Sequence, residues 1–424
     1  MKNKLLLSLL VVCFALSDNN PNIKYCGFDE ALHHKGNVEN LYKDRSKQIL
    51  DVIKNLSDQI NDRDITYHIP VVFHIVYNND NQNLPDSVIH SQIDVLNEDF
   101  RRMNENADET REEFLQFAGD ANIEFFLAQT DENGNPTSGI TRTYTSESGF
   151  PYITIEDILT GNISLDRVKS SSTGGVDAWD TSKYLNIWVC NVEESFLGQV
   201  LGFAYPPFNI DDALDQIDLD IVPDWPLEGF PSDDNLQGVV LHYPVVGTNN
   251  PFGNDDDIDN NDMGRACVHE VGHYLGLRHI WGDATLFEDG CSVDDGIEDT
   301  PNQSAASNFE CNFNQNSCSG NYPDMVENYM DYSNDSCMNM FTNNQIIVMR
   351  AVLEICRPGL IEGQEENECA DGDINSDDDI NILDVVLLVN IIIGFDEPVS
   401  CADLNDDSIY NVLDVVILIN TILE

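Results

Sequence analysis

Apolar residues recur along most of the chain with two different spacings. The run from Ile69 to Tyr77 (IPVVFHIVY) is rich in β-branched and aromatic residues, which is typical of a buried strand. Similar runs predict further strands at 123–128, 184–192, 201–205 and 238–243. Apolar residues at helical spacing predict helices over 86–103 and 343–354. Together these elements predict an α/β fold, in which a twisted, mixed but mostly parallel sheet with two long helices is followed by an irregular half.

One helical stretch carries chemistry as well as apolar residues. Residues 269–279 read H-E-x-x-H-x-x-G-x-x-H. On a helix, His269 and His273 share a face, and this spacing suits one zinc ion. Gly276 can adopt the left-handed backbone that ends a helix, so that the chain turns back and His279 becomes a third ligand. Three protein ligands leave a position for water, as in catalytic zinc sites, and Glu270 can take a proton from that water.

The net charge of the chain argues against some classes of binding partner. The 424 residues include 76 acidic and 20 basic side chains, for a formal net charge of −56. Nucleic acid and anionic lipid would be repelled by such a surface. Some carboxylates are therefore expected to bind calcium, and the others to form a strongly solvated surface suited to salty surroundings.

The cysteines and the N-terminus indicate secretion. Eleven cysteines fit an oxidising compartment. Lys2 and Lys4 precede an apolar run from Leu5 to Leu16, and residues 15–17 resemble a cleavage site, so residues 1–17 are predicted to be a signal peptide. The run is too short for a stable membrane anchor, and no other stretch is long and apolar enough to span a bilayer. An extracellular protein is expected.

Residues 18–63 are polar and helix-prone, and they are predicted to form a pro-segment. Its most informative residue is Cys26, because a thiolate is an excellent zinc ligand. Cys26 could fill the open zinc position and keep an enzyme latent until cleavage near Arg63. A structural disulfide or an uninvolved thiol is the alternative, and the sequence leaves the two interpretations open.

The extended zinc motif is that of the metzincin metalloproteases. The stretches 328–332 (NYMDY) and 337–342 (CMNMFT), together with 184–189 (YLNIWV) and 299–301 (DTP), resemble the pappalysin family within that group. The resemblance extends from about Ile69 to Arg350 and implies a metzincin-type catalytic domain, which is predicted to occupy 64–358. It implies that Met330 forms an apolar floor beneath the zinc and that the Tyr332 phenol donates a hydrogen bond to the developing oxyanion.

The resemblance also implies features of the irregular half. Two disulfides are expected, Cys291–Cys318 and Cys311–Cys337, although four cysteines alone allow three connectivities. Related enzymes hold structural calcium here, and oxygen ligands are available from Asp294, Asp295, Asp299 and Thr300. Strand 201–205 is expected to be the edge strand along which a peptide substrate lies antiparallel. Asp335 is a candidate wall of the pocket beyond the scissile bond, with a basic residue as the guessed preference.

After a Glu-rich linker at 359–370, a pattern of oxygen ligands occurs twice within 371–424. The first loop offers Asp373, Asn375, Asp377, Asp379, Asn381 and Asp384, and the second offers Asp403, Asn405, Asp407, Ile409, Asn411 and Asp414. Each loop runs into an apolar helix. This resembles a dockerin module, a small all-α domain with two calcium loops, although Asp replaces the usual Glu at position 12 and position 6 is not Gly. A cohesin-type partner that retains the protein at the cell surface and a calcium-stabilised tail without such a partner are both compatible with it.

These observations predict a secreted zinc endopeptidase with one catalytic zinc ion, at least two structural calcium ions, and protein or peptide substrates. A calcium-dependent binding or scaffold protein with a silent zinc domain is the alternative from another class. A zinc amidase that acts on small molecules is a second rival, against which the expected edge strand argues because it suits an extended peptide.

Overall fold

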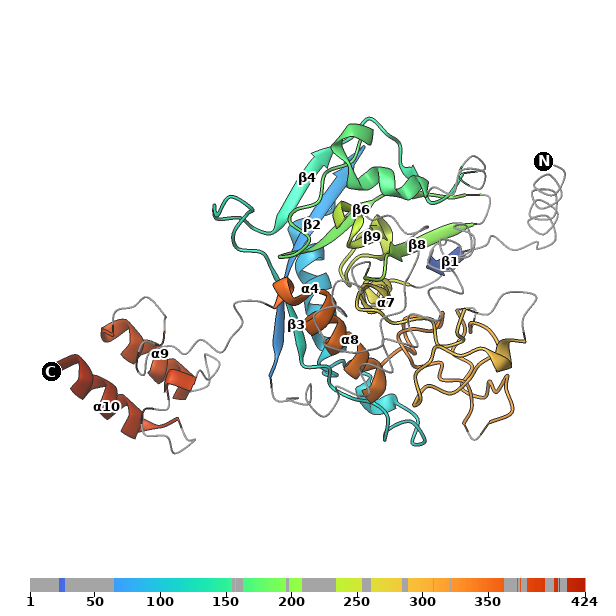
Figure 1. The fold of residues 1–424 in the computed structure, drawn as a ribbon. Coiled ribbons are helices and arrows are strands. Elements are labelled where there is room, and N and C mark those ends of the chain that lie inside the picture. The colour runs from blue at the N-terminus through green and yellow to red at the C-terminus, as the bar shows by residue number, and fades with distance from the viewer. Residues whose placement is uncertain are drawn as a thin grey trace, which may run out of the picture. The chain divides into compact units, whose positions relative to one another are not determined.

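The computed structural model divides the chain into two compact units, Met1–Ile361 and Glu362–Glu424 (Figure 1). In the first unit it describes residues 23–26, 65–154, 157, 163–195, 198–207, 234–253, 261–283, 289–307, 309–320 and 322–361. In the second unit it describes residues 372, 374, 380–392, 400–402, 404 and 410–423. The predicted signal peptide and most of the predicted pro-segment lie outside these ranges.

A seven-stranded sheet organises the first unit, with strand order β1-β8-β9-β6-β2-β3 and β4 also beside β2. The strands are β1 (Ile23–Cys26), β2 (Tyr67–Tyr77), β3 (Ile123–Leu127), β4 (Ile140–Tyr144), β6 (Leu185–Cys190), β8 (Gln199–Ala204) and β9 (Val239–His242). All pairs are parallel except β8 with β9. A separate two-stranded sheet joins β5 (Phe150–Pro151) to β7 (Val192–Glu193). The predicted mixed, mostly parallel sheet is confirmed, whereas β1 and β4 were not predicted.

Each face of the sheet buries its own set of apolar side chains. On one face, β2 residues such as Phe73 and Ile75 pack in the main core with α4 (Asp86–Phe100), α7 (Arg265–Tyr274) and α8 (Asn343–Cys356). On the other face, Trp188 and Phe203 pack with Tyr152. The helix predicted over 86–103 ends at Phe100, since Arg102 has a left-handed backbone with φ of 49°. A capping box formed by Thr342 and Gln345 starts α8.

The segment between α7 and α8 is irregular, as predicted. Its described residues contain turns and one short 3-10 helix, η7 (Gly290–Ser292). The disulfides Cys291–Cys318 and Cys311–Cys337 both form, with Cα–Cα distances of 5.5 and 5.8 Å. These covalent links stabilise a region without long helices or strands among its described residues, and they confirm the expected pairing.

The second unit contains two helices, α9 (Ile382–Ile392) and α10 (Val412–Leu423). Leu388 and Leu418 are fully buried in its small core. Cys401 is disulfide-bonded, and Cys369, which precedes the first ligand loop, lies outside the described residues. In neither unit do the described residues include a helix long and apolar enough to cross a membrane.

Candidate active site

Three buried imidazoles converge at the end of α7. His269 and His273 lie one turn apart on this helix, which ends at Tyr274. Gly276, with φ of 90°, then lets the chain turn back so that His279 faces the other two. The Nε2 atoms of the three rings lie 3.0, 3.1 and 3.2 Å from one another. The structure therefore brings together the three residues that the sequence spacing predicts.

The hydrogen bonds of the three imidazole rings determine which nitrogen of each ring is available to bind a metal ion. His269 Nδ1 donates to the Tyr329 carbonyl at 2.7 Å, and His273 Nδ1 donates to the Leu277 carbonyl at 2.9 Å. His279 Nδ1 donates to the Asp283 carboxylate at 2.6 Å. With each proton on Nδ1, three Nε2 lone pairs point at one another, an arrangement that needs a cation between them. Burial lowers the pKa of His269 and His273, which keeps both rings neutral as zinc ligands must be.

Cys26 completes this group. It ends β1, which lies at the edge of the sheet and pairs in parallel with β8 so that Cys26 lies opposite Gly202. The strand expected at the edge from the sequence, 201–205, therefore lies between β1 and β9. The Cys26 sulfur and the three imidazoles place one ligand atom each within 4.8 Å of one another. Three histidines and one thiolate form a tetrahedral donor set that zinc accepts readily. Of the two interpretations of Cys26 left open by the sequence, the geometry favours the metal ligand.

Glu270 lies beside the imidazoles and is fully buried. Burial raises its pKa to about 8, although the Cys26 thiol and His279 act in the opposite direction. The Glu270 side chain fits only because Gly202 has no side chain: a Cβ atom there would lie 2.6 Å from Glu270 Cγ. A glycine in β8 thus provides the space that Glu270 occupies.

The loop after residue 328 closes the site from below. Met330 is buried so tightly against α7 that a Cβ on Gly272 would lie 2.4 Å from its sulfur. The Tyr332 ring centroid is 4.8 Å from that of His279, and its hydroxyl donates to the Cys26 carbonyl at 3.2 Å. The structure thus brings Met330 against α7 and Tyr332 beside His279.

Two neighbours of His279 were not predicted. Trp281 stacks on the His279 ring, with centroids 4.3 Å apart and an angle of 6° between the planes. Asp283 accepts the proton of His279 Nδ1 and also binds Arg278 Nε at 3.1 Å. In the sequence, only their positions two and four residues after His279 point to these contacts. Those positions predict a contact only once the location of His279 in the fold is known.

The calcium candidates of the irregular half take part in different local contacts. Asp299 accepts hydrogen bonds from Thr342 Oγ1 and the Asn344 amide at the start of α8. Thr300 donates to Asp295, whereas Asp294 accepts from the Gly296 amide. Among the described residues, the cluster of His, Cys, Asp and Glu side chains able to hold an ion is the one formed by Cys26 and the three histidines. The expectation that Asp294, Asp299 and Thr300 form one ligand set is therefore not supported.

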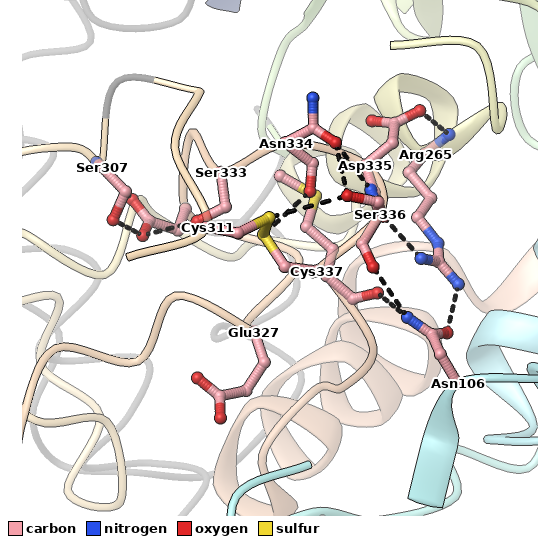
Figure 2. Close-up of a disulfide and its surroundings, with 12 residues drawn as sticks. Asn106, Arg265, Ser307, Cys311, Glu327, Ser333, Asn334, Asp335, Ser336 and Cys337 are labelled. Carbon is pink, nitrogen blue, oxygen red and sulfur yellow. Dashed lines mark hydrogen bonds between the residues drawn. A yellow bond between two sulfur atoms is a disulfide. The ribbon is translucent and has the colours of Figure 1, made fainter. Parts of the chain in front are cut away.

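Asp335, a candidate pocket wall from the sequence, is buried. Its carboxylate accepts hydrogen bonds from the amides of Met263 and Arg265, at the start of α7. Figure 2 shows this contact beside the Cys311–Cys337 disulfide. The Asp335 carboxylate therefore binds the N-terminal end of the helix that carries His269 and His273.

Only part of the C-terminal ligand pattern lies in the described residues. Asp384 accepts from the amides of Ile374 and Asn381 at 2.9 and 2.8 Å, and Asp414 accepts from those of Leu404 and Asn411 at 3.0 and 2.9 Å. The two repeats thus share one hydrogen-bond pattern. The candidates Asp373, Asn375, Asp377, Asp379, Asp403, Asn405, Asp407 and Ile409 lie outside the described residues.

Comparison with known proteins agrees with this site. The model of a peptidase M43 family, described as pregnancy-associated plasma protein-A, matches residues 225–354. An extracellular metalloprotease of Arthroderma benhamiae is 43% identical over 122 residues, which are 28% of this chain and 40% of the relative. Extracellular metalloprotease 1 of Coccidioides posadasii is 42% identical over 99 residues, 23% of this chain and 33% of the relative. The chain thus spans less than half of the length of these relatives.

Two solved structures are matched over more of their length. Mature mirolysin of Tannerella forsythia, in complex with a cleaved peptide, is 41% identical with a TM-score of 0.57, and the match covers 70% of this chain and 96% of that one. A promirolysin mutant of the same organism is 37% identical with a TM-score of 0.60, and the match covers 79% of this chain and 96% of that one.

Proposed function

The chain belongs to the pappalysin (M43) family of metallopeptidases, and from this premise we propose that it is a secreted zinc endopeptidase that cleaves peptide bonds within protein substrates. The observation that carries the proposal is the convergence of three Nε2 lone pairs beside a buried carboxylate. A solved relative, mature mirolysin, is in complex with a cleaved peptide, which supports peptides as the substrate class.

The residues of the chain divide the chemistry among themselves. Zinc held by His269, His273 and His279 would polarise the scissile carbonyl and lower the pKa of a bound water. Glu270 takes the proton of the attacking water and passes it to the leaving amine. Burial of Glu270 raises its pKa, which favours a carboxyl group that can hold a proton between the two transfers. Tyr332 donates a hydrogen bond to the oxyanion, and its contact with the Cys26 carbonyl supports an ability to reach a peptide oxygen here.

A substrate would use the edge that β1 now occupies. The side of β8 that faces away from β9 accepts an extended segment through main-chain hydrogen bonds, as its pairing with β1 illustrates. A peptide on this edge would pass Gly202, beside which Glu270 lies. Since β1 fills the same place, substrate binding requires that β1 first leaves.

The same contacts support latency. Cys26 is buried within ligand distance of the three histidines, and its strand covers the substrate edge. The proposed pro-segment thus blocks the water position and the peptide-binding strand at once. Replacing Cys26 with Ala should remove the thiol but not the pairing of β1 with β8, so the untrimmed variant should cleave a fluorogenic peptide faster than untrimmed wild type and more slowly than the trimmed enzyme. An equally latent variant would show that the thiol is dispensable for latency.

The C-terminal unit is proposed to be a dockerin-like calcium module that docks to a cohesin-type protein. Its support is the repeated bonding of Asp384 and Asp414, together with exposed apolar residues at equivalent positions of α9 and α10. These are Val386 and Val416, and Val389 and Ile419. Calcium bound per full-length chain should fall by two when both aspartates are replaced with Ala. An unchanged calcium content would contradict the calcium module and would indicate a C-terminal unit stabilised only by its small apolar core.

One experiment tests the enzymatic proposal against a silent zinc domain. The secreted, trimmed protein is incubated with a denatured protein substrate, with and without a zinc chelator, and the cuts are mapped by mass spectrometry. Internal cuts that disappear with chelator are expected. Glu270→Gln should bind zinc and cut nothing, because only the proton carrier is lost. Full activity of that variant would refute the mechanism, and a zinc-loaded wild type without cuts would favour the binding-protein alternative.

A further inference from the structure

The helix that carries two of the zinc ligands begins without a local cap. Its first residue is Arg265, and the preceding cap position is Gly264, whose backbone is left-handed with φ of 76°. The first amides of any helix lack partners within the helix, and a side-chain oxygen at the cap position usually accepts from one of them. Glycine has no such oxygen. The acceptor for α7 must therefore come from another part of the chain.

Asp335 supplies that acceptor from a loop 70 residues further along the chain. Its Oδ2 atom accepts from the Met263 amide at 3.0 Å and from the Arg265 amide at 3.4 Å. In return, Arg265 Nη1 donates to the Asp335 carbonyl at 2.6 Å, and Figure 2 shows both side chains at this junction. The carboxylate also faces the positive end of the helix dipole, which favours it electrostatically.

The cation of Arg265 at the same helix end is balanced by a second carboxylate. Arg265 Nε and Nη2 donate to the two oxygens of Asp99 at 3.1 and 3.2 Å, a bidentate pair between two buried side chains. Arg265 Nη2 also donates to Asn106 Oδ1 at 2.8 Å. The start of α7 is thus tied to α4, through Asp99, as well as to the loop of Asp335.

The loop of Asp335 is itself firmly held. The disulfide between Cys311 and Cys337 anchors one side of it, and Asn106 Nδ2 donates to the Ser336 and Met338 carbonyls at 3.3 and 3.1 Å (Figure 2). The same loop carries Met330 and Tyr332, and its Tyr329 carbonyl accepts from His269. One loop therefore fixes α7 at two points, the first turn and the first zinc ligand.

From this we propose that Asp335 is a positioning residue of the zinc site, which caps α7 from the loop after Met330 and so sets His269 and His273 against Tyr332. The inference rests on the proposed zinc peptidase function and assigns Asp335 a role other than pocket wall. His269 directly follows the first turn of α7, which begins at Arg265. Without the carboxylate this turn frays, the three Nε2 atoms separate, and zinc is held less tightly.

The test compares two helix caps in the full-length chain. Asp335→Ala and Asp335→Asn are measured beside Asp299→Ala, which removes the same kind of contact from α8, a helix without a zinc ligand. The zinc dissociation constant is obtained by competition with a chromophoric chelator, and Tm is recorded with and without zinc. We expect Kd to rise about tenfold for Asp335→Ala and about threefold for Asp335→Asn, which keeps one acceptor oxygen. Asp299→Ala should lower both Tm values and leave Kd unchanged.

Three results would overturn the inference while leaving the peptidase proposal intact. The first is a Kd of Asp335→Ala equal to that of wild type, with a fall in Tm like that of Asp299→Ala. The second is a changed preference at the cleaved bond with unchanged zinc affinity, which would restore Asp335 as a pocket wall. The third applies if Asp335→Ala does not fold, and is a Kd of Asp335→Asn equal to that of wild type. A wild-type chain that takes up no zinc would overturn the peptidase proposal, and this inference with it.

Discussion

Asp283 should control how tightly the third ligand holds zinc. Its carboxylate is buried and accepts the His279 Nδ1 proton at 2.6 Å, while Arg278 holds its other oxygen at 3.1 Å. The other two imidazoles donate to neutral backbone carbonyls. A carboxylate partner makes His279 the more basic ligand, so zinc affinity should depend on this charge in particular.

The magnitude follows from the type of hydrogen bond. A bond to a charged group contributes about 1.5–3 kcal/mol, against about 0.5–1.5 kcal/mol for a neutral pair. Asp283→Asn keeps an acceptor oxygen but loses the charge, so about 1–1.5 kcal/mol should disappear, or roughly tenfold in zinc Kd. Asp283→Ala also leaves the imidazole and the Arg278 guanidinium without this partner, and about 100-fold is expected.

Chelator competition on the full-length chain, with circular dichroism to verify folding, measures the change. Asp289→Ala is the control, because Asp289 accepts from the Cys291 amide at the start of η7. The control should leave Kd within about twofold of wild type, a change of roughly 0.4 kcal/mol. If both Asp283 variants also remain within this limit, the carboxylate serves only the local fold and the reasoning is refuted.

Three further changes test other parts of the site. Tyr332→Phe should lower kcat of the trimmed enzyme about 100-fold with little change in KM or zinc content, because only an oxyanion donor is lost; steady-state kinetics would contradict this with an unchanged kcat. Gly202→Ala places a Cβ 2.6 Å from Glu270 Cγ and should lower kcat at least about tenfold while zinc stays bound, and wild-type turnover would show that Glu270 has room to move. Burial lowers the pKa of His74 from 6.5 to about 4. As the pH falls, the unfolded chain is therefore protonated at His74 before the folded chain is. The stability present above pH 6.5 is lost as the pH falls toward 4, and the loss reaches roughly 3 kcal/mol. Urea unfolding at pH 7 and 4.5 should show a smaller loss of stability in His74→Gln than in wild type, with the remainder due to other buried histidines, and an equal loss in both would contradict the assignment.

The zinc ligands were predictable because their spacing is local. A helix fixes His269 and His273, and Gly276 permits the turn that brings back His279, so that no distant contact is needed. The strands with long β-branched runs were predictable for the same reason. The four residues of β1 and the alternating polar residues of β4 gave weaker signals, and both strands form because the sheet offers them a partner.

What the sequence could not provide was the choice among distant partners. Asp299 looked like a calcium ligand beside Asp294, yet it binds the start of α8. Asp335 looked like part of a pocket, yet it binds the start of α7. A carboxylate suits a cation and a helix terminus equally well, and only the packing of segments far apart in the chain decides between them.

The short pairing of β1 with β8 has a consequence for what happens to β1 after the chain is cut. Among the described residues, β1 contributes three register pairs and one thiol to this contact, and a strand of this length would by itself bind weakly as a separate peptide. As long as Cys26 belongs to the same chain as the histidines, its effective concentration at the site is on the order of millimolar, so even a weak ligand stays bound. One cut between them converts this into an encounter between two molecules. In the latent form that we propose, a single proteolytic event would therefore be enough to let β1 leave the site at the dilution of an extracellular fluid.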